Sequence, residues 1–259
     1  MGLFGKMFEK KTCAICGGEI GLLGNRKLED GNMCKNCAKK LSPWFSERRR
    51  STVESIKEQL AYREANKAEV AKFNPTLTFG TGTKVYLDED ARKFIVTRSS
   101  PRNFEESNPD VIDFSQVTGV DIDIEENSSE DMREDKEGRS VSYNPPRYFY
   151  SYDFNVIIRV NNPYFDQISF QLNSSSVEIN ENGAVPANMK PYPERNQDYS
   201  EYKRMGEEIK QALTSARQQV RDEAAAARAP KQAVVCKRCG ASTIPDESGR
   251  CEFCGGAAL

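Results

Sequence analysis

The eight cysteines of this chain form four Cys-x-x-Cys pairs, two near each end, and the sequence contains no histidine. A Cys-x-x-Cys turn directs two thiolates at one point, so two neighbouring pairs supply the four sulfurs that Zn²⁺ prefers. The pattern therefore predicts two structural zinc sites that flank a cysteine-free body. The predicted ligands are Cys13, Cys16, Cys34 and Cys37 in the first site, and Cys236, Cys239, Cys251 and Cys254 in the second.

The first two pairs have the layout of a treble clef. Residues 13–18 have the composition of a zinc knuckle, in which glycine allows a tight turn. The Asp30-Gly31 step is a strong hairpin signal, and the second cysteine pair leads directly into residues of helical composition. A ligand pair at the start of a helix is also favourable electrostatically, because the positive helix end stabilises thiolate.

A second, longer helix is expected to begin near Ser51, where Ser51 and Glu54 fit a capping box. It should end before the Asn74-Pro75 step, because proline disfavours helical geometry in the preceding residue. Its apolar face is expected to hold Val53, Ile56 and Leu60.

Three consecutive arginines, residues 48–50, lie between the two expected helices. They could contact phosphate, or they could form a solvated connector. The sequence favours the connector, because charge runs are usually solvated.

Residues 1–73 resemble an uncharacterised bacterial family that is named only as a domain of unknown function. The resemblance rests on Cys-Ala-Ile-Cys-Gly, on Leu-Glu-Asp-Gly-Asn-Met-Cys and on the Leu-Ser-Pro continuation. The family is carried at the N-terminus of multi-domain proteins. The resemblance implies a treble-clef zinc fold at the first four cysteines and implies no activity.

Between residues 77 and 180 the apolar residues recur with a period of two, which is typical of antiparallel strands. The longest alternation runs from Tyr148 to Val160 and is followed by a turn and a second alternating segment, so a hairpin is expected. In that strand Phe149 and Ile157 interrupt an otherwise polar face. They are expected either to be covered by the N-terminal helices or to form part of an interaction patch.

An amphipathic helix is expected over about 199–228, with an apolar stripe that would cover one face of the sheet. Meandering strands followed by a C-terminal helix resemble a pleckstrin-homology-like or GRAM-like domain, as does the phrase from Asp113 to Asp121. Some such domains bind phosphoinositides, but residues 73–199 carry 12 basic and 22 acidic side chains, which disfavours an anionic headgroup. The acidic stretch 125–137 lacks the pattern of a calcium loop and is interpreted as a solvated, mobile hairpin loop.

The last two cysteine pairs are each followed by glycine, so both are expected to form knuckles of a short zinc ribbon. A module this small cannot bury a core, so metal must supply most of its folding free energy. The fold class is therefore α+β with three domains: residues 1–73, a treble-clef module with a helix; residues 74–228, the β domain with its C-terminal helix; and residues 229–259, a tether and the ribbon.

Four sulfurs at each site leave no open zinc position, and the absence of histidine removes the commonest general base. The chain is therefore interpreted as a non-enzymatic, zinc-containing adaptor that binds a protein partner. Nucleic-acid binding is an alternative, because residues 1–72 carry 15 basic and 9 acidic side chains and the ribbon carries Lys237-Arg238. Membrane association through residues 1–8 is a weaker alternative. The N-terminus lacks a secretory pattern, so the expected location is the cytoplasm.

Overall fold

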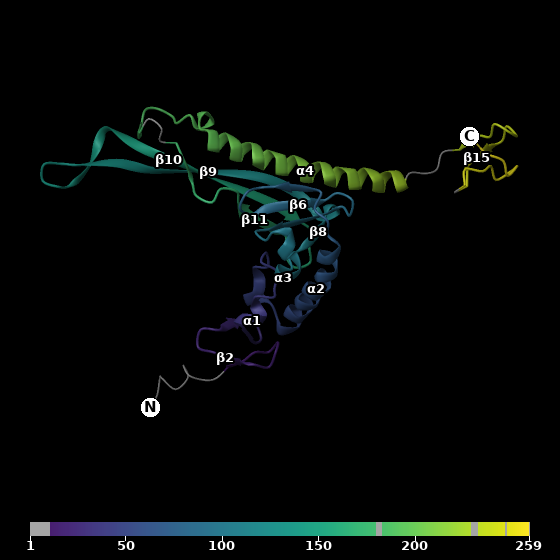
Figure 1. The fold of residues 1–259 in the computed structure, drawn as a ribbon, viewed down its shortest axis with the longest axis horizontal. Coiled ribbons are helices and arrows are strands. Elements are labelled where there is room, and N and C mark those ends of the chain that lie inside the picture. Colours follow the sequence, from purple (N-terminus) through teal and green to yellow (C-terminus); the bar gives the residue numbers. More distant parts are fainter. Residues whose placement is uncertain (1–10, 180–182, 229–232, 247, 259) are drawn as a thin grey trace. The chain divides into compact units, whose positions relative to one another are not determined.

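The computed structural model describes residues 11–179, 183–228, 233–246 and 248–258 (Figure 1). Residues 1–8, to which the membrane alternative refers, lie outside this part. The chain divides into two compact units, Met1–Gln218 and Gln219–Leu259. In the described part of the chain, no helix combines the length and the apolarity that crossing a membrane requires.

The N-terminal module, called the zinc module after the ion that its four cysteines are predicted to bind, consists of two small hairpins and a short helix. The strand pairs are β1 (Lys11–Thr12) with β2 (Glu19–Ile20), and β3 (Asn25–Lys27) with β4 (Asn32–Cys34). Helix α1 (Lys35–Ala38) follows β4 directly. The predicted order of knuckle, hairpin and helix-borne cysteine pair is confirmed.

Helix α2 (Val53–Lys72) begins near Ser51 and ends before the Asn-Pro step, both as predicted, but its capping residue differs from the prediction. The N-cap is Thr52, whose hydroxyl accepts from the backbone N–H of Ser55 at 3.2 Å. The predicted capping box at Ser51 is wrong, because the Ser51 hydroxyl instead donates to the Glu47 carbonyl at 2.9 Å. That contact closes the preceding 3₁₀ turn, η2, which spans Glu47–Arg50.

Helix α2 joins the zinc module to the β domain. Its N-terminal half contributes Ile56 to the buried cluster of the zinc module, and its C-terminal half contributes Val70 to a cluster with Tyr86 and Ile95 of the first sheet. Phe104, from the short helix α3 (Phe104–Ser107), completes that second cluster. One helix therefore packs on both parts of the first unit.

The first sheet is a four-stranded antiparallel meander in which sequential strands are neighbours. One of its faces carries Tyr86 and Ile95, which pack against α2 and α3. The other face carries Val85 and Phe94, which are fully buried. Both faces are therefore covered, which explains why β6 and β7 are apolar without clear alternation. The strands are β5 (Leu77–Phe79), β6 (Lys84–Asp88), β7 (Lys93–Thr97) and β8 (Val111–Asp113).

The second sheet is built on two long strands that form a ribbon. Strand β10 pairs with β9 on one side and with three shorter strands on the other. The predicted hairpin after Val160 is confirmed by the pairing of β10 with β11. The strands are β9 (Val117–Glu134), β10 (Ser140–Val160), β11 (Gln167–Gln171), β12 (Val177–Glu178) and β13 (Val185–Pro186).

The acidic stretch 125–137 is mostly strand, so its interpretation as a loop is wrong. Residues 125–134 continue β9 and pair with β10, and the turn itself lies between Glu134 and Ser140. Its exposure is as predicted, since nearly all of its side chains face solvent. The sequence shows no apolar alternation here because the ribbon covers no core at this end. The strand still forms, because backbone pairing needs no apolar side chains.

Helix α4 (Gln197–Arg228) covers the apolar face of the second sheet, as the stripe predicts. Tyr199 packs edge-on against Tyr152 and Phe154 of β10, with ring centroids 5.0 and 5.1 Å apart. At Gly206 the helix approaches the sheet so closely that an added Cβ would lie 3.1 Å from the Ile122 side chain. The buried helix residues are Tyr199, Met205, Gly206, Ile209, Leu213 and Ala216.

The second unit contains the C-terminal cysteine module. Strand β14 (Val234–Val235) pairs with β15 (Ser242–Thr243), and Arg250 forms an isolated bridge with Ala257. Each of these two small ladders holds one cysteine pair, so the module is a double knuckle as predicted.

Candidate metal centres

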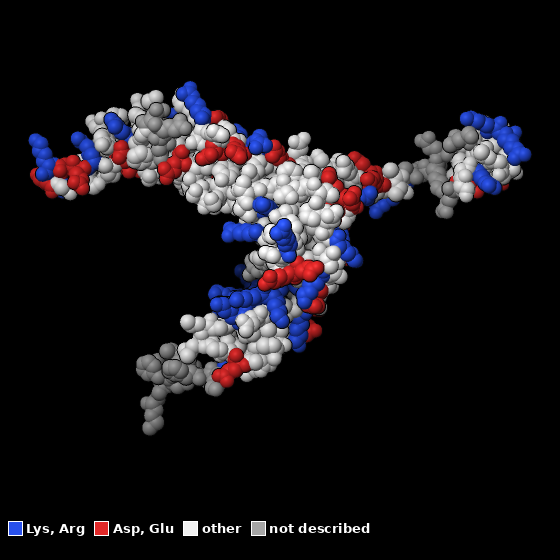
Figure 2. Space-filling view, in the orientation of Figure 1, with Lys and Arg blue, Asp and Glu red and all other residues white. Residues whose placement is uncertain are grey.

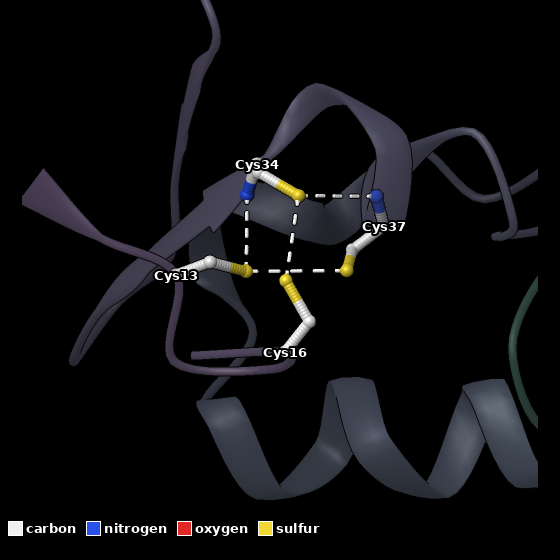
Figure 3. A group of neighbouring side chains, drawn as sticks. All are labelled: Cys13, Cys16, Cys34 and Cys37. Atoms are coloured by element: carbon white, nitrogen blue, oxygen red, sulfur yellow. Dashed lines mark hydrogen bonds between the residues drawn. The ribbon is translucent and has the colours of Figure 1, made fainter. Parts of the chain in front are cut away.

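The four N-terminal cysteines converge on one point (Figure 3). The sulfur atoms of Cys13 and Cys37 lie 3.9 Å apart, and those of Cys16 and Cys34 also lie 3.9 Å apart. All four sulfurs lie within 4.8 Å of one another. The structure therefore brings together every predicted ligand of the first site.

The spacing of these sulfurs fits a tetrahedral metal ion. A Zn–S bond of about 2.3 Å places two tetrahedral sulfurs about 3.8 Å apart. A disulfide would require about 2.05 Å between sulfurs, and all eight cysteines are free. Four thiolates are the donor set typical of structural zinc, and this geometry could hold such an ion.

Two different local structures supply the ligands of the first site. In the knuckle, the Gly17 N–H donates to the Cys13 carbonyl at 2.8 Å, and Gly17 has φ of 72°, which favours glycine. In the other pair, Cys34 is the N-cap of α1, and its sulfur accepts from the Cys37 N–H at 3.4 Å. The Cys34 N–H in turn donates to the Cys13 sulfur at 3.3 Å, which connects the two halves of the site.

Backbone hydrogen bonds set the acidity of the thiols. Burial opposes the ionisation of Cys13, but hydrogen bonds from backbone N–H groups, including those of Cys16 and Cys34, lower its pKa to about 6. Burial and the neighbouring thiols raise the pKa of Cys37. A bound cation would shift all four groups toward thiolate, because metal binding displaces the protons.

The C-terminal cysteines form a second group of the same size. The sulfurs of Cys236 and Cys254 lie 3.7 Å apart, as do those of Cys239 and Cys251, so this group also fits a tetrahedral ion. Both pairs repeat the knuckle hydrogen bond of the first module. The N–H of the glycine after each pair donates at 2.8 Å to the carbonyl of its first cysteine, and both glycines have positive φ.

The second group shows the same division between acidic and less acidic thiols. Burial opposes the ionisation of Cys251, but the N–H groups of Cys254 and Phe253 lower its pKa to about 6. The Ala241 N–H favours the thiolate of Cys239, but burial and the neighbouring thiols raise its pKa to about 11. In each group, therefore, the pKa of one thiol is lowered and that of another is raised.

A buried polar network positions the first metal centre on the β domain. Arg63 of α2 forms an ion pair with Asp110, whose side chain is fully buried. Asp110 also accepts from the Ser42 hydroxyl at 2.8 Å, and the Arg63 Nε donates to the carbonyl of Lys40 at 3.3 Å. Lys40 and Ser42 lie in the segment that follows Cys37 and α1, so the network connects that segment, α2 and the sheet.

Asn66 completes the same network one turn further along α2. Its side-chain amide donates to the Pro109 carbonyl at 2.7 Å and accepts from the Val111 N–H at 3.0 Å. Sequence reasoning did not identify Arg63, Asn66 or Asp110. The available signal was the spacing of Arg63 and Asn66 from Ile56, which places them on the face of α2 that the structure buries.

Comparison with known families gives one match. Residues 12–59 match a family described as "Domain of unknown function (DUF4428)". The match covers the first metal centre and ends within helix α2, so it confirms the family resemblance for this part of the chain. No curated protein and no solved structure matches the chain.

Proposed function

We propose that this protein is a non-catalytic adaptor that carries two structural zinc ions and binds a protein partner. Each group of four sulfurs would complete the tetrahedral coordination of Zn²⁺ and leave no position for substrate. The chain has no histidine to serve as a general base. Its domains are therefore better suited to binding a partner than to catalysing a reaction.

The unpaired edge of β9 carries the proposal of a protein partner. Strand β9 pairs only with β10, whereas β10 is also paired on its other side. Within the described residues, the outer edge of β9 has no strand partner. Free strand edges bind extended segments of other chains through backbone hydrogen bonds.

The charge of β9 favours one class of partner. Seven of the eighteen residues of β9 are acidic and only Arg133 is basic, and Figure 2 shows carboxylates gathered at the far end of the ribbon. Repulsion between carboxylates would oppose pairing of this edge with a second copy of itself. An extended basic segment would be complementary to it. The acidic residues of β9 are Asp121, Asp123, Glu125, Glu126, Glu130, Asp131 and Glu134.

The polar face of the ribbon offers an apolar contact beside this edge. Phe149 and Ile157 are half-buried there. Phe149 lies opposite Ser129 of β9 and lines a hollow of 170 Å³ with Tyr150 and Glu178. On the opposite face, Tyr152 is buried but Tyr148 and Tyr150 are only half-buried, because the ribbon extends beyond the core. A hollow next to a free edge would accept an apolar side chain of the partner.

The fold supports a pleckstrin-homology-like assignment for the middle of the chain. A four-stranded meander is followed by a second antiparallel sheet and then by α4, which covers the second sheet. This order of antiparallel strands and a covering helix is the observation that supports the assignment. The acidic ribbon favours a protein ligand over an anionic lipid headgroup for this domain.

A matched pair of variants tests the proposal. A partner would first be captured from the native host and then purified for direct binding measurements. Phe149→Asp should abolish binding and leave the melting temperature nearly unchanged, because Phe149 is only half-buried. Leu22→Asp, at a side chain 85% exposed in the zinc module, is the control and should bind normally.

Two results would contradict the assignment of the β9 edge and Phe149 as the docking surface. A large loss of stability in Phe149→Asp would show that this side chain belongs to the core. Unchanged binding of the purified partner would show that the partner docks elsewhere. Neutralising Asp123 and Glu125 together should weaken binding of a basic partner and should make the remaining affinity less sensitive to salt.

A further inference from the structure

An open groove of 760 Å³ lies on the zinc module, between the β3–β4 hairpin and the η2 turn. It shares no lining residue with either metal centre or with the β9–β10 ribbon, and it does not depend on the proposed adaptor function. It brings together two basic segments that are distant in the sequence. The lining residues are Asn25, Arg26, Lys27, Leu28, Glu29, Arg48 and Arg49.

Backbone contacts hold two of the guanidinium groups in place. Arg48 donates to the Lys27 carbonyl at 2.5 Å, and Arg26 donates to the carbonyls of Leu23 and Asn25 at 3.3 and 3.1 Å. Neither contact neutralises charge, because a carbonyl is a neutral acceptor. The groups are therefore oriented before any ligand arrives.

The positive charge in the groove is not compensated. Four of its seven lining side chains are basic, and only Glu29 is acidic. Within the described residues, Arg26, Arg48 and Arg49 form no ion pair with a carboxylate, whereas the next residue along, Arg50, pairs with Glu47. Burial lowers the pKa of Arg48, and the positive charges of Arg49 and Arg26 lower it further.

We propose that this groove binds a phosphate group. Guanidinium groups match the geometry of phosphate oxygens, and a bound dianion would relieve the repulsion among three close arginines. No aromatic side chain lines the groove, so the phosphate, and not a stacked base, would be the recognised feature. The sequence alone favoured a solvated connector at residues 48–50; the placement of Arg48 and Arg49 against the β3–β4 hairpin changes that interpretation.

The phosphate could belong to a small ligand or to a nucleic-acid backbone, and two probes distinguish these sources. Binding of inorganic pyrophosphate to the full zinc-loaded chain would be measured by calorimetry. Binding of a fluorescent duplex oligonucleotide would be measured by anisotropy at several salt concentrations. Binding of pyrophosphate indicates that the site takes a small phosphate ligand. Binding of the oligonucleotide alone indicates that it takes a nucleic-acid backbone, and that binding should then weaken steeply as the salt concentration rises.

Neighbouring arginines provide a matched pair of variants. Arg49 lines the groove and Arg50 does not, and both are exposed on the same 3₁₀ turn. Each change to glutamine removes one positive charge, so non-specific attraction falls equally in the two variants. We expect Arg49→Gln to weaken binding of the active probe by about tenfold, as the loss of a charge-assisted hydrogen bond predicts. Arg50→Gln should bind like the unaltered protein.

Two outcomes would overturn the proposal. If neither probe binds, the groove is not a phosphate site. If Arg49→Gln and Arg50→Gln weaken binding equally, the attraction is diffuse and the groove has no specific role. Both variants should keep the melting temperature of the unaltered protein, because Arg49 is exposed and the Arg50 ion pair is on the surface.

Discussion

The two metal centres have the same four ligands and nearly the same sulfur spacing, but they differ in what surrounds them. The N-terminal centre is part of a cluster of buried residues that includes Ile56 of helix α2 and only two of the ligands. In the C-terminal module the buried cluster consists of Cys236, Cys251 and Ala258, so two of its three members are ligands. The buried residues of the N-terminal cluster are Cys13, Ile20, Leu28, Met33, Cys37, Leu41 and Ile56.

This difference separates two roles for a structural metal. In the C-terminal module a bound metal would replace a core, and folding there should depend almost entirely on it. In the N-terminal module a bound metal would add to a small core that includes Ile56 of α2, a helix that also packs on the β domain. The consequences of metal loss should therefore stay local at one end and spread at the other. Four substitutions, ordered by their expected effect on the first unit, test this comparison.

Removing one ligand of the N-terminal centre should have the largest effect. Apparent binding of structural zinc contributes about 10–16 kcal/mol in small modules, which exceeds the stability of many domains. Cys34→Ser should therefore unfold the zinc module and lower the melting temperature of the first unit, because α2 loses one of its two packing partners. Circular dichroism and amide hydrogen exchange would measure this. Unchanged protection of the β3–β4 hairpin would contradict it.

Removing the buried carboxylate should have the next largest effect. Asp110→Ala leaves Arg63 buried without its partner, and breaking such a pair costs about 3–5 kcal/mol. The control is Asp121→Ala, which breaks a half-exposed pair with Arg159 and should cost about 0–1 kcal/mol. Denaturant unfolding of both variants gives the comparison. Equal losses would show that the buried network does not hold the zinc module on the β domain.

Removing the N-cap of α2 should have a moderate effect. Thr52→Ala should destabilise the first unit by about 1 kcal/mol, because the Ser55 N–H loses its acceptor. Ser51→Ala should cost less, since the Ser51 hydroxyl serves the 3₁₀ turn and not the helix. The opposite order in denaturant unfolding would favour the capping box that the sequence suggests.

Removing one ligand of the C-terminal centre should have the smallest effect on the first unit. Cys251→Ser should disorder the double knuckle and leave the melting of the two sheets unchanged, because the chain divides into two units. Nuclear magnetic resonance would detect the local loss, and circular dichroism the unchanged transition. Loss of the whole cooperative transition would mean that the units are coupled.

Local patterns made much of this structure predictable. Cysteine spacing predicted both metal centres, because a knuckle is determined by residues close in sequence and by glycines such as Gly17. The alternation of apolar residues predicted the inner parts of the ribbon strands, and the apolar stripe predicted α4, because both patterns are also set by residues close in sequence. These patterns report on burial, and burial in those elements is apolar.

The remaining features depend on pairing between distant residues. Arg63 and Asp110 are both charged, and nothing local distinguishes them from solvated residues; only the meeting of α2 with the segment before β8 buries them. The outer half of β9 was missed because its acidic side chains cover no core, although its backbone pairs with β10. The groove at Arg26 and Arg48 likewise requires a hairpin and a 3₁₀ turn to meet.

The metal content of the purified protein tests the central claim, that each group of cysteines binds its own zinc ion. Elemental analysis under reducing conditions should give about two zinc ions per chain, and Cys34→Ser and Cys251→Ser should each retain about one. The retained ion in each variant should be the one bound by the unaltered group. A ratio near one in the unaltered protein, or disulfide bonds between the paired cysteines, would contradict the assignment.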